Sequence, residues 1–226
     1  GVLPVGGAGG DPGAGAAGAP EMAALGGSKV GGGGVTVSEA VVDAVAKIRE
    51  NIVLRRAGKL SVPGGVVATY SHNITSPGVG TIGVVVGLTA ADGTPLPPAA
   101  RLPAAAFARK IAMHVAAARP VYVARSCVPA DVLEAERAVL REQAAKSGKS
   151  ADMVAKMVEG RLNKFYGEVV VGDQEFMLGD TRQPVSKALA EASKAIGTPL
   201  KVAAFLRFTV GEDSTPAPAA AAAPAS

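Results

Sequence analysis

The distribution of glycine limits the possible folds of this sequence more than any other feature. Fourteen of the 29 glycines lie in residues 1–34, and the last 13 residues, from Ser214, contain seven alanines and three prolines. Such segments bury little apolar surface but lose the full conformational entropy of ordering, so we expect residues 1–37 and 213–226 to be disordered. About 175 residues remain, enough for one compact domain or two small subdomains.

Composition excludes several classes of protein. No apolar run approaches the roughly 18–20 residues of a transmembrane helix, so we expect no membrane association. The single cysteine excludes a disulfide scaffold and cannot by itself form a zinc site. Residues 1–34 lack the pattern of a secretory signal and the Arg/Ser-rich pattern of a transit peptide. Because the chain opens with Gly1, we expect a processed or truncated N-terminus.

The charge of the central region is positive but dispersed. Residues 38–211 contain 22 basic and 15 acidic side chains, a net charge of +7. This excess could favour an acidic partner or a nucleic acid. However, the charges are interspersed and no basic run exceeds two residues, which is typical of a solvated surface. Only Lys164, followed by Phe165 and Tyr166, places aromatic rings beside a base, so we expect no direct nucleic-acid binding; an RNA-binding accessory protein stays the less favoured alternative.

Hydrophobic periodicity predicts the order helix, three strands, three helices, linker, helix and strand. The expected helices begin at Ser38 and span about 103–118, the residues after Pro129, 150–166 and 184–196; the expected strands are 51–56, 66–71, 81–88 and 202–210. The first three strands favour an antiparallel meander, because their connections are too short for helical crossovers. The order predicts an α+β fold with antiparallel three-stranded sheets packed with helices.

Two glycines on one face of strand 81–88 are unusual for a strand. Gly83 and Gly87 alternate with Ile82, Val84 and Val86, which share the other face. Glycine lowers strand propensity and usually marks a place where another backbone comes close. The approaching backbone belongs either to the fold itself or to a partner.

The sequence contains no recognisable catalytic constellation. Cys127 would need a base, which His72 or His114 could supply only through tertiary contact; a plain buried thiol is the simpler interpretation. Gly148-Lys149-Ser150 resembles the end of a phosphate-binding loop, but Gln143 stands where that motif requires glycine. We therefore expect a protein that is not an enzyme and that holds no cofactor and no metal.

His114 is the residue with the most open interpretation. At helical spacing it lies about 20° from Phe107, inside an apolar stripe that includes Ile111, Val115 and Ala118. A histidine in such a stripe is a satisfied core residue, a contact for a partner, or a group for metal binding or acid–base chemistry. The sequence leaves all three open and favours them in that order.

Five segments, in order, resemble translation elongation factor Ts. They are Ile-Arg-Glu-Asn-Ile-Val-Leu-Arg-Arg (48–56), Gly-Val-Gly-Thr-Ile-Gly-Val-Val-Val (78–86), Ile-Ala-Met-His-Val-Ala-Ala (111–117), Met-Val-Glu-Gly-Arg-Leu-Asn-Lys-Phe-Tyr (157–166) and Phe-Leu-Arg-Phe-Thr-Val-Gly-Glu (205–212). The resemblance covers about residues 38–212. The Pro-Gly-Val-Gly insertion before Ile82 and the stretch 196–202 look most like organellar forms of plants and algae, particularly mitochondrial ones.

The resemblance implies guanine nucleotide exchange on the GTPase elongation factor Tu. The chain would bind that partner in its GDP-bound and nucleotide-free forms, and self-association is possible. The family's partner contacts carry over to Ile82, Gly83, Met113, His114 and Val115. Arg161 and Phe165 match a family helix without a defined role. The implied compartment is the mitochondrial matrix, with the chloroplast stroma or the bacterial cytoplasm as alternatives.

The resemblance also implies a domain organisation. We expect a partial N-terminal core subdomain at 38–98 and a C-terminal core subdomain at 99–212, with a projecting helical arm at about 150–196. Family members begin with a small ubiquitin-associated-like domain and carry a Thr-Asp-Phe-Val segment that should lie upstream of Ile48; no Thr-Asp-Phe occurs in this sequence. The alternative function is therefore a truncated or divergent paralogue that binds elongation factor Tu without efficient exchange.

Overall fold

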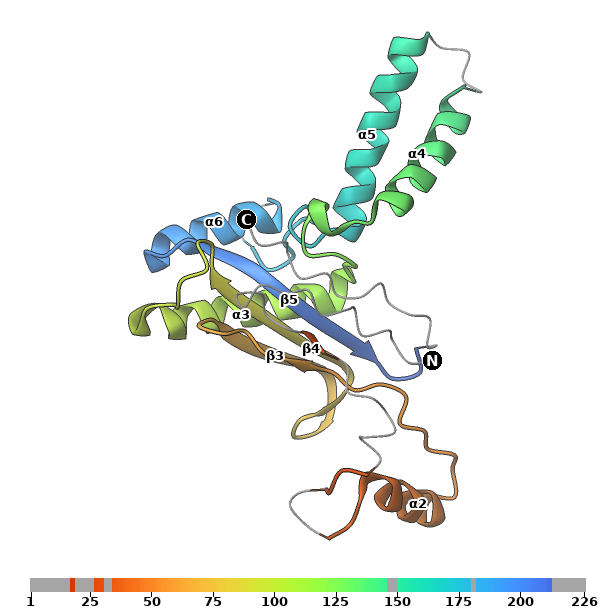
Figure 1. The fold of residues 1–226 in the computed structure, drawn as a ribbon, viewed down its shortest axis with the longest axis vertical. Helices are drawn as coiled ribbons and strands as arrows, with labels where there is room; N and C mark the ends of the chain where they lie inside the picture. The colour runs from red at the N-terminus through yellow and green to blue at the C-terminus, as the bar shows by residue number, and fades with distance from the viewer. Residues whose placement is uncertain (1–16, 19–26, 31–33, 146–149, 180–181, 213–226) are drawn as a thin grey trace.

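The computed structural model describes residues 17–18, 27–30, 34–145, 150–179 and 182–212. These residues form an α+β fold in which a three-stranded antiparallel sheet is packed with helices, as the sequence predicts. A pair of helices projects from this body (Figure 1). Residues 213–226, most of 1–37 and the Gly148-Lys149 dipeptide lie outside the described residues.

The sheet is built from a hairpin and a strand from the far end of the sequence. Strands β3 (Val66–Ser76) and β4 (Val79–Ala90) form the hairpin, and β5 (Leu200–Thr209) pairs with the other edge of β4. The predicted strand at 51–56 is wrong, because that segment is not a strand. The third strand of the sheet is instead β5, which has apolar residues on both faces and pairs along almost the full length of β4.

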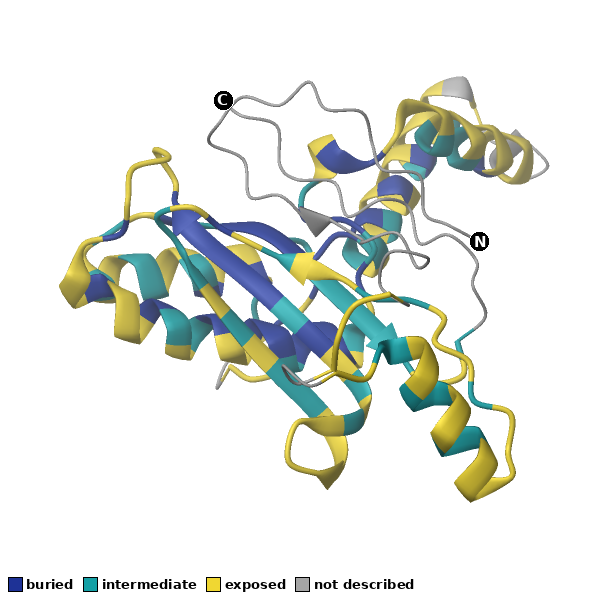
Figure 2. Cartoon of the chain, turned by 60° about the horizontal axis from the view of Figure 1, so that its bottom comes forward, coloured by how far each residue is buried: buried dark blue, intermediate teal, exposed yellow. Residues whose placement is uncertain are grey.

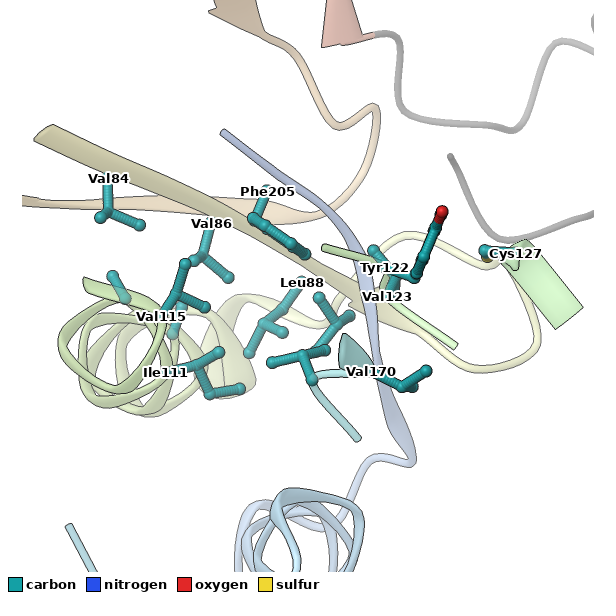
Figure 3. Packing of buried hydrophobic residues seen from close by; sticks show 14 of the residues in the cluster. Val84, Val86, Leu88, Ile111, Val115, Tyr122, Val123, Cys127, Val170 and Phe205 are labelled. Carbon is teal, nitrogen blue, oxygen red and sulfur yellow. The ribbon is translucent and has the colours of Figure 1, made fainter. Parts of the chain in front are cut away.

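One face of the sheet is covered by α3 (Pro98–Ala118). Figure 3 shows Val84, Val86 and Leu88 of β4 pointing toward Ile111 and Val115 of this helix. Small buried residues complete the contact, namely Ala104, Ala108 and Ala112. The predicted start at residue 103 is wrong: Pro98 takes the first position, where no amide hydrogen is needed, and Pro103 lies inside the helix.

Among the described helices, the one nearest the N-terminus lies apart from the sheet. Helix α2 (Val37–Ile48) has no buried residue, and Figure 2 shows it exposed or half-buried along its length. It begins one residue before the predicted start at Ser38, because Thr36 is the N-cap and bonds reciprocally with Glu39 in a capping box. A short antiparallel pair, β1 (Ala17–Gly18) with β2 (Lys59–Leu60), connects the N-terminal segment to the residues before the sheet.

The projecting arm consists of α4 (Ala130–Ala145) and α5 (Ala151–Val169), which run side by side in opposite directions (Figure 1). The expected bounds of 150–196 differ from this, because α6 (Val185–Ile196) packs against α3 in the body. At the base of the arm, Arg125 of the short helix η1 (Arg125–Cys127) binds both carboxylate oxygens of Asp173 and the side chain of Asn163. Arg125 therefore links α5 to the body.

The core continues from the sheet to the base of the arm. Buried residues beyond α3 and β4 include Tyr122, Val123, Val128, Leu162, Val170 and Val171. The sheet joins strands from both sides of the expected subdomain boundary at 98/99, so that division stays a prediction. No helix in the described part of the chain is both long enough and apolar enough to span a bilayer.

Candidate partner-binding surface

Gly83 and Gly87 lie on the face of β4 that points away from α3, and the fold explains only one of them. A Cβ at Gly87 would lie 2.3 Å from Cγ2 of Val62, so the buried Val62 side chain requires glycine there. A Cβ at Gly83 would have no atom of the described residues within 4 Å. Gly83 also lacks the positive φ angle that favours glycine. The missing side chain at Gly83 therefore leaves open space on the sheet surface.

A groove of about 320 Å³ runs past Gly83. The neighbours of Gly83 across the sheet are Ser71 on β3 and Phe208 on β5. The groove is lined by the segment before the sheet, by the β3–β4 hairpin and by the end of β5, specifically by Val53, Arg55, Arg56, Gly80, Thr81, Gly83, Phe208, Thr209, Val210, Gly211 and Glu212. Its lining combines apolar and cationic side chains.

A charged cluster lies beside this groove, formed by the lining residues Arg56 and Glu212 and by Arg207, which does not line it. Glu212 accepts a hydrogen bond from Arg56 at 3.2 Å and one from Arg207 at 2.7 Å. Burial acts to raise the pKa of Glu212, but the hydrogen bonds, first among them that from Arg207, outweigh it and lower the pKa to about 2. The guanidinium of Arg56 also stacks over the Phe208 ring at 4.9 Å. The cluster ties residues 55–56 to the end of β5.

Ile82 does not share the Gly83 face. Consecutive strand residues point to opposite faces, and Ile82 is half-buried against the core on the α3 side. It pairs with His72 on β3 and with Thr209 on β5. A partner that touches both Ile82 and Gly83 must therefore reach around the end of the sheet.

His114 is fully buried and fully hydrogen-bonded, with a relative exposure of 0%. Its Nε2 lies 3.0 Å from Oε1 of Gln174, and its Nδ1 accepts from the backbone N–H of Met177 at 3.4 Å. Because the amide oxygen of Gln174 can only accept, Nε2 carries the proton and the ring is neutral. Burial lowers the pKa of His114, and the bond to Gln174 partly opposes that shift.

This geometry is that of a satisfied core histidine, the first of the three interpretations. Direct contact of a partner with the His114 ring stays a prediction, and it requires residues 174–178 to move away from the ring. Val115 is likewise 0% exposed and faces the sheet, whereas Met113 is half-buried. Of the five expected contacts, Gly83 alone is exposed.

The structure reveals an exposed apolar pair over His114 that sequence reasoning missed. Met177 is 62% exposed and Leu178 is 39% exposed, although Phe176 beside them is buried with its ring 5.8 Å from that of His114. The segment that carries them is irregular, so no periodicity marks it. The available signal was three consecutive large apolar residues, Phe176 to Leu178, in a stretch without helical or strand pattern.

The remaining candidate residues have structural partners. Arg161 donates to Gln143 across the arm at 2.6 Å, and Phe165 packs half-buried against the core. Cys127 is buried, and His72 lies 3.0 Å from the Tyr70 hydroxyl. No described residue requires glycine at Gly160 in α5, because nothing among them lies within 4 Å of a Cβ placed there. No group of three or more potential metal ligands occurs in the part of the chain that the structure describes.

Comparison with known proteins places these features in a family. A family model described as Elongation factor TS matches residues 14–212. Elongation factor Ts of Brucella ovis is 46% identical over 180 residues, which cover 79% of this chain and 56% of that protein. Elongation factor Ts of Bartonella bacilliformis is 43% identical over 177 residues, which cover 78% of this chain and 55% of that protein. The chain thus spans about half the length of the curated relatives that it matches.

Proposed function

The chain belongs to the elongation factor Ts family of translation elongation factors, and we propose that it is a guanine nucleotide exchange factor for the GTPase elongation factor Tu. In this role it binds the GDP-bound GTPase, promotes release of GDP and holds the nucleotide-free form. It carries out no covalent chemistry of its own.

Gly83 is the observation that carries the partner-binding part of the proposal. A glycine in the middle of a strand lowers its stability and often marks a place where a ligand or another backbone approaches closely. No described residue of this chain needs it at Gly83, whereas Val62 needs it at Gly87. A partner that approaches the outer face of β4 supplies the missing reason.

Exchange requires differential binding and no nucleophile. A factor that binds the nucleotide-free GTPase more tightly than the GDP-bound one weakens GDP binding by the same factor, since the coupling free energy is reciprocal. A shaped surface is enough for this. The open groove at Gly83 and the exposed pair Met177 and Leu178 provide two such surfaces, on opposite sides of the sheet.

The alternative is a family member that holds elongation factor Tu without ejecting nucleotide efficiently. One observation motivates it: no Thr-Asp-Phe occurs between Gly1 and Ile48, where the resemblance places that segment. Tight binding without a change in the GDP release rate would select this alternative.

The compartment that we propose is one that contains a bacterial-type translation system. The bacterial relatives favour this in general terms. Within it, the mitochondrial matrix is the first hypothesis, because the Pro-Gly-Val-Gly insertion before Ile82 resembles organellar plant and algal forms. The chloroplast stroma and the bacterial cytoplasm are the alternatives. Fractionation of the source cells with an antibody against the chain distinguishes them.

Release of fluorescent GDP from the cognate elongation factor Tu in a stopped-flow instrument tests the function. We expect the chain to accelerate release in a saturable manner. Gly83→Val should raise the concentration for half-saturation, whereas Thr69→Val should not; Thr69 is an exposed residue on the same sheet face that does not line the groove. No acceleration and no binding at saturating protein would refute both forms of the proposal.

A further inference from the structure

The groove beside Gly83 holds more positive charge than its own carboxylate neutralises. Among the described residues that line it, Glu212 is the one acidic side chain, and both of its oxygens are engaged, one by Arg56 and one by Arg207. Arg55 adds a second guanidinium to the groove lining, beside that of Arg56. Two lining arginines against one lining carboxylate, which Arg207 from outside the groove also engages, leave a surplus of positive charge, since arginine stays protonated in proteins.

Only one of the three guanidinium groups is available to a ligand. The side chains of Arg56 and Arg207 are 15% and 10% exposed, and Arg56 is held against Phe208. Nη2 of Arg207 is buried and has no hydrogen-bond partner among the described residues, so the carboxylate does not satisfy the cluster. Arg55 is exposed and forms no ion pair or side-chain hydrogen bond with any described residue.

Apolar side chains stand beside these guanidinium groups. Val53 is 58% exposed and Val210 is 76% exposed, and both line the groove. In the same groove, the missing side chain of Gly83 leaves the surface of β4 open to solvent. Exposed apolar residues that gather at one place mark a docking surface, unlike apolar residues scattered singly, and Val53 and Val210 line the same groove. The groove therefore fits a segment in which a carboxylate is flanked by apolar side chains.

The same features favour a protein over a nucleic acid as the occupant. Nucleic-acid binding needs cations that follow the phosphate backbone and aromatic rings on which bases stack. In the described groove a single arginine is free, and the one aromatic ring, Phe208, is already covered by Arg56. One guanidinium in a short apolar groove matches one carboxylate, which it can bind through two parallel hydrogen bonds.

We propose that this groove binds an acidic segment of the partner GTPase, with a carboxylate of that segment on Arg55 and its apolar side chains against Val53 and Val210. The inference rests on the proposed function, because the segment belongs to elongation factor Tu. It adds the chemistry of the recognised segment and makes Arg55 a residue that determines partner affinity.

Calorimetric titration of nucleotide-free elongation factor Tu into the full chain tests the proposal. Arg55→Glu should weaken binding about tenfold or more and Arg55→Lys about threefold at most, because close charge pairs at interfaces commonly contribute this much. Arg101→Glu is the matched control, since Arg101 is an exposed arginine on α3 outside the groove, and it should change binding less than twofold. The melting temperatures of all three variants should equal that of the wild type.

Each other result overturns the proposal in a recognisable way. If the wild type binds and Arg55→Glu binds equally well, the groove assignment fails while the proposed function stands. If the wild type does not bind elongation factor Tu, both fail. A lower melting temperature of Arg55→Glu would mean that Arg55 pairs within this chain. If the wild type binds a 20-nucleotide single-stranded RNA and Arg55→Glu does not, the groove is a nucleic-acid site. If Arg55→Glu sediments differently from the wild type, the occupant is a second copy of the chain.

Discussion

Gly83 and Gly87 allow the same substitution to be tested twice on one face of one strand. Gly87→Ala places a methyl group 2.3 Å from Cγ2 of Val62 and 3.4 Å from Cδ2 of Leu60. Val62 is buried and β-branched, so its side chain cannot rotate away easily. Overpacking of this kind costs about 1–3 kcal/mol. We therefore expect Gly87→Ala to lower the free energy of unfolding by that amount.

Gly83→Ala should have the opposite sign. The new methyl group meets nothing within 4 Å, and the backbone φ is not in the positive range. Replacing glycine in a compatible conformation stabilises a protein by about 0.4–1 kcal/mol, chiefly because the unfolded chain loses freedom. The two variants should therefore differ by about 1.5–4 kcal/mol, which corresponds to about 3–15 °C in melting temperature for a protein of this size.

Urea unfolding followed by far-ultraviolet circular dichroism measures this difference, since the chain has no tryptophan to report by fluorescence. Equal slopes of free energy against urea would show that the denatured states are comparable. If Gly83→Ala destabilises the protein as much as Gly87→Ala, the fold itself needs glycine at Gly83. The inference from Gly83 to a partner would then be refuted.

Four further predictions concern buried and charged groups. His114→Ala should destabilise the protein by about 3–4 kcal/mol in urea unfolding, because it leaves a cavity and an unpaired Gln174 oxygen. Burial holds the pKa of His114 below 6.5 in the folded state, so as the pH falls the unfolded chain is protonated before the folded one. The free energy of unfolding should therefore decrease as the pH is lowered below about 6.5, and it should decrease less in His114→Gln. The pKa of Glu212 is lowered from 4.5 to about 2, so its contribution to the free energy of unfolding is complete above pH 4.5 and is lost as the pH falls toward 2. Glu212→Gln should remove that part of the acid dependence in pH-jump denaturation. An unchanged profile would contradict the Arg56–Glu212–Arg207 cluster. Arg125→Ala should speed hydrogen exchange at the base of α5 and leave the sheet protected, because Arg125 joins Asp173 to the arm; exchange that rises equally in β4 would refute a local role.

Local periodicity was enough to predict most elements but not their partners. The alternation in 202–210 and the helical spacing after Pro129 and Pro184 correspond to β5, α4 and α6, each within a few residues. The third strand of the sheet could not be assigned, because the pairing of β4 with β5 joins residues more than a hundred positions apart. The start of α3 was missed because proline normally begins a helix, and both Pro98 and Pro103 occur in it.

The candidate site depended on contacts that no local pattern contains. Gly83 and Gly87 look equivalent in the sequence, and only the position of Val62 separates them. Likewise, the apolar stripe that contains His114 is the same whether the ring packs in the core or contacts a partner. The ring is buried in the core because the segment with Gln174 and Met177, about 60 residues later, packs and bonds against it. Tertiary packing, and not residue type, determined which candidates are open to a partner.

The rate of GDP release from the cognate elongation factor Tu, measured against increasing chain concentration, tests the central claim most directly. The account predicts that the wild type accelerates release to a plateau, that Thr69→Val reaches the same plateau at the same concentration, and that Gly83→Val needs a higher concentration to reach it. A release rate that stays at its intrinsic value at saturating wild-type protein would contradict exchange activity. A Gly83→Val curve identical to that of the wild type would contradict the outer face of β4 as the place where the GTPase binds.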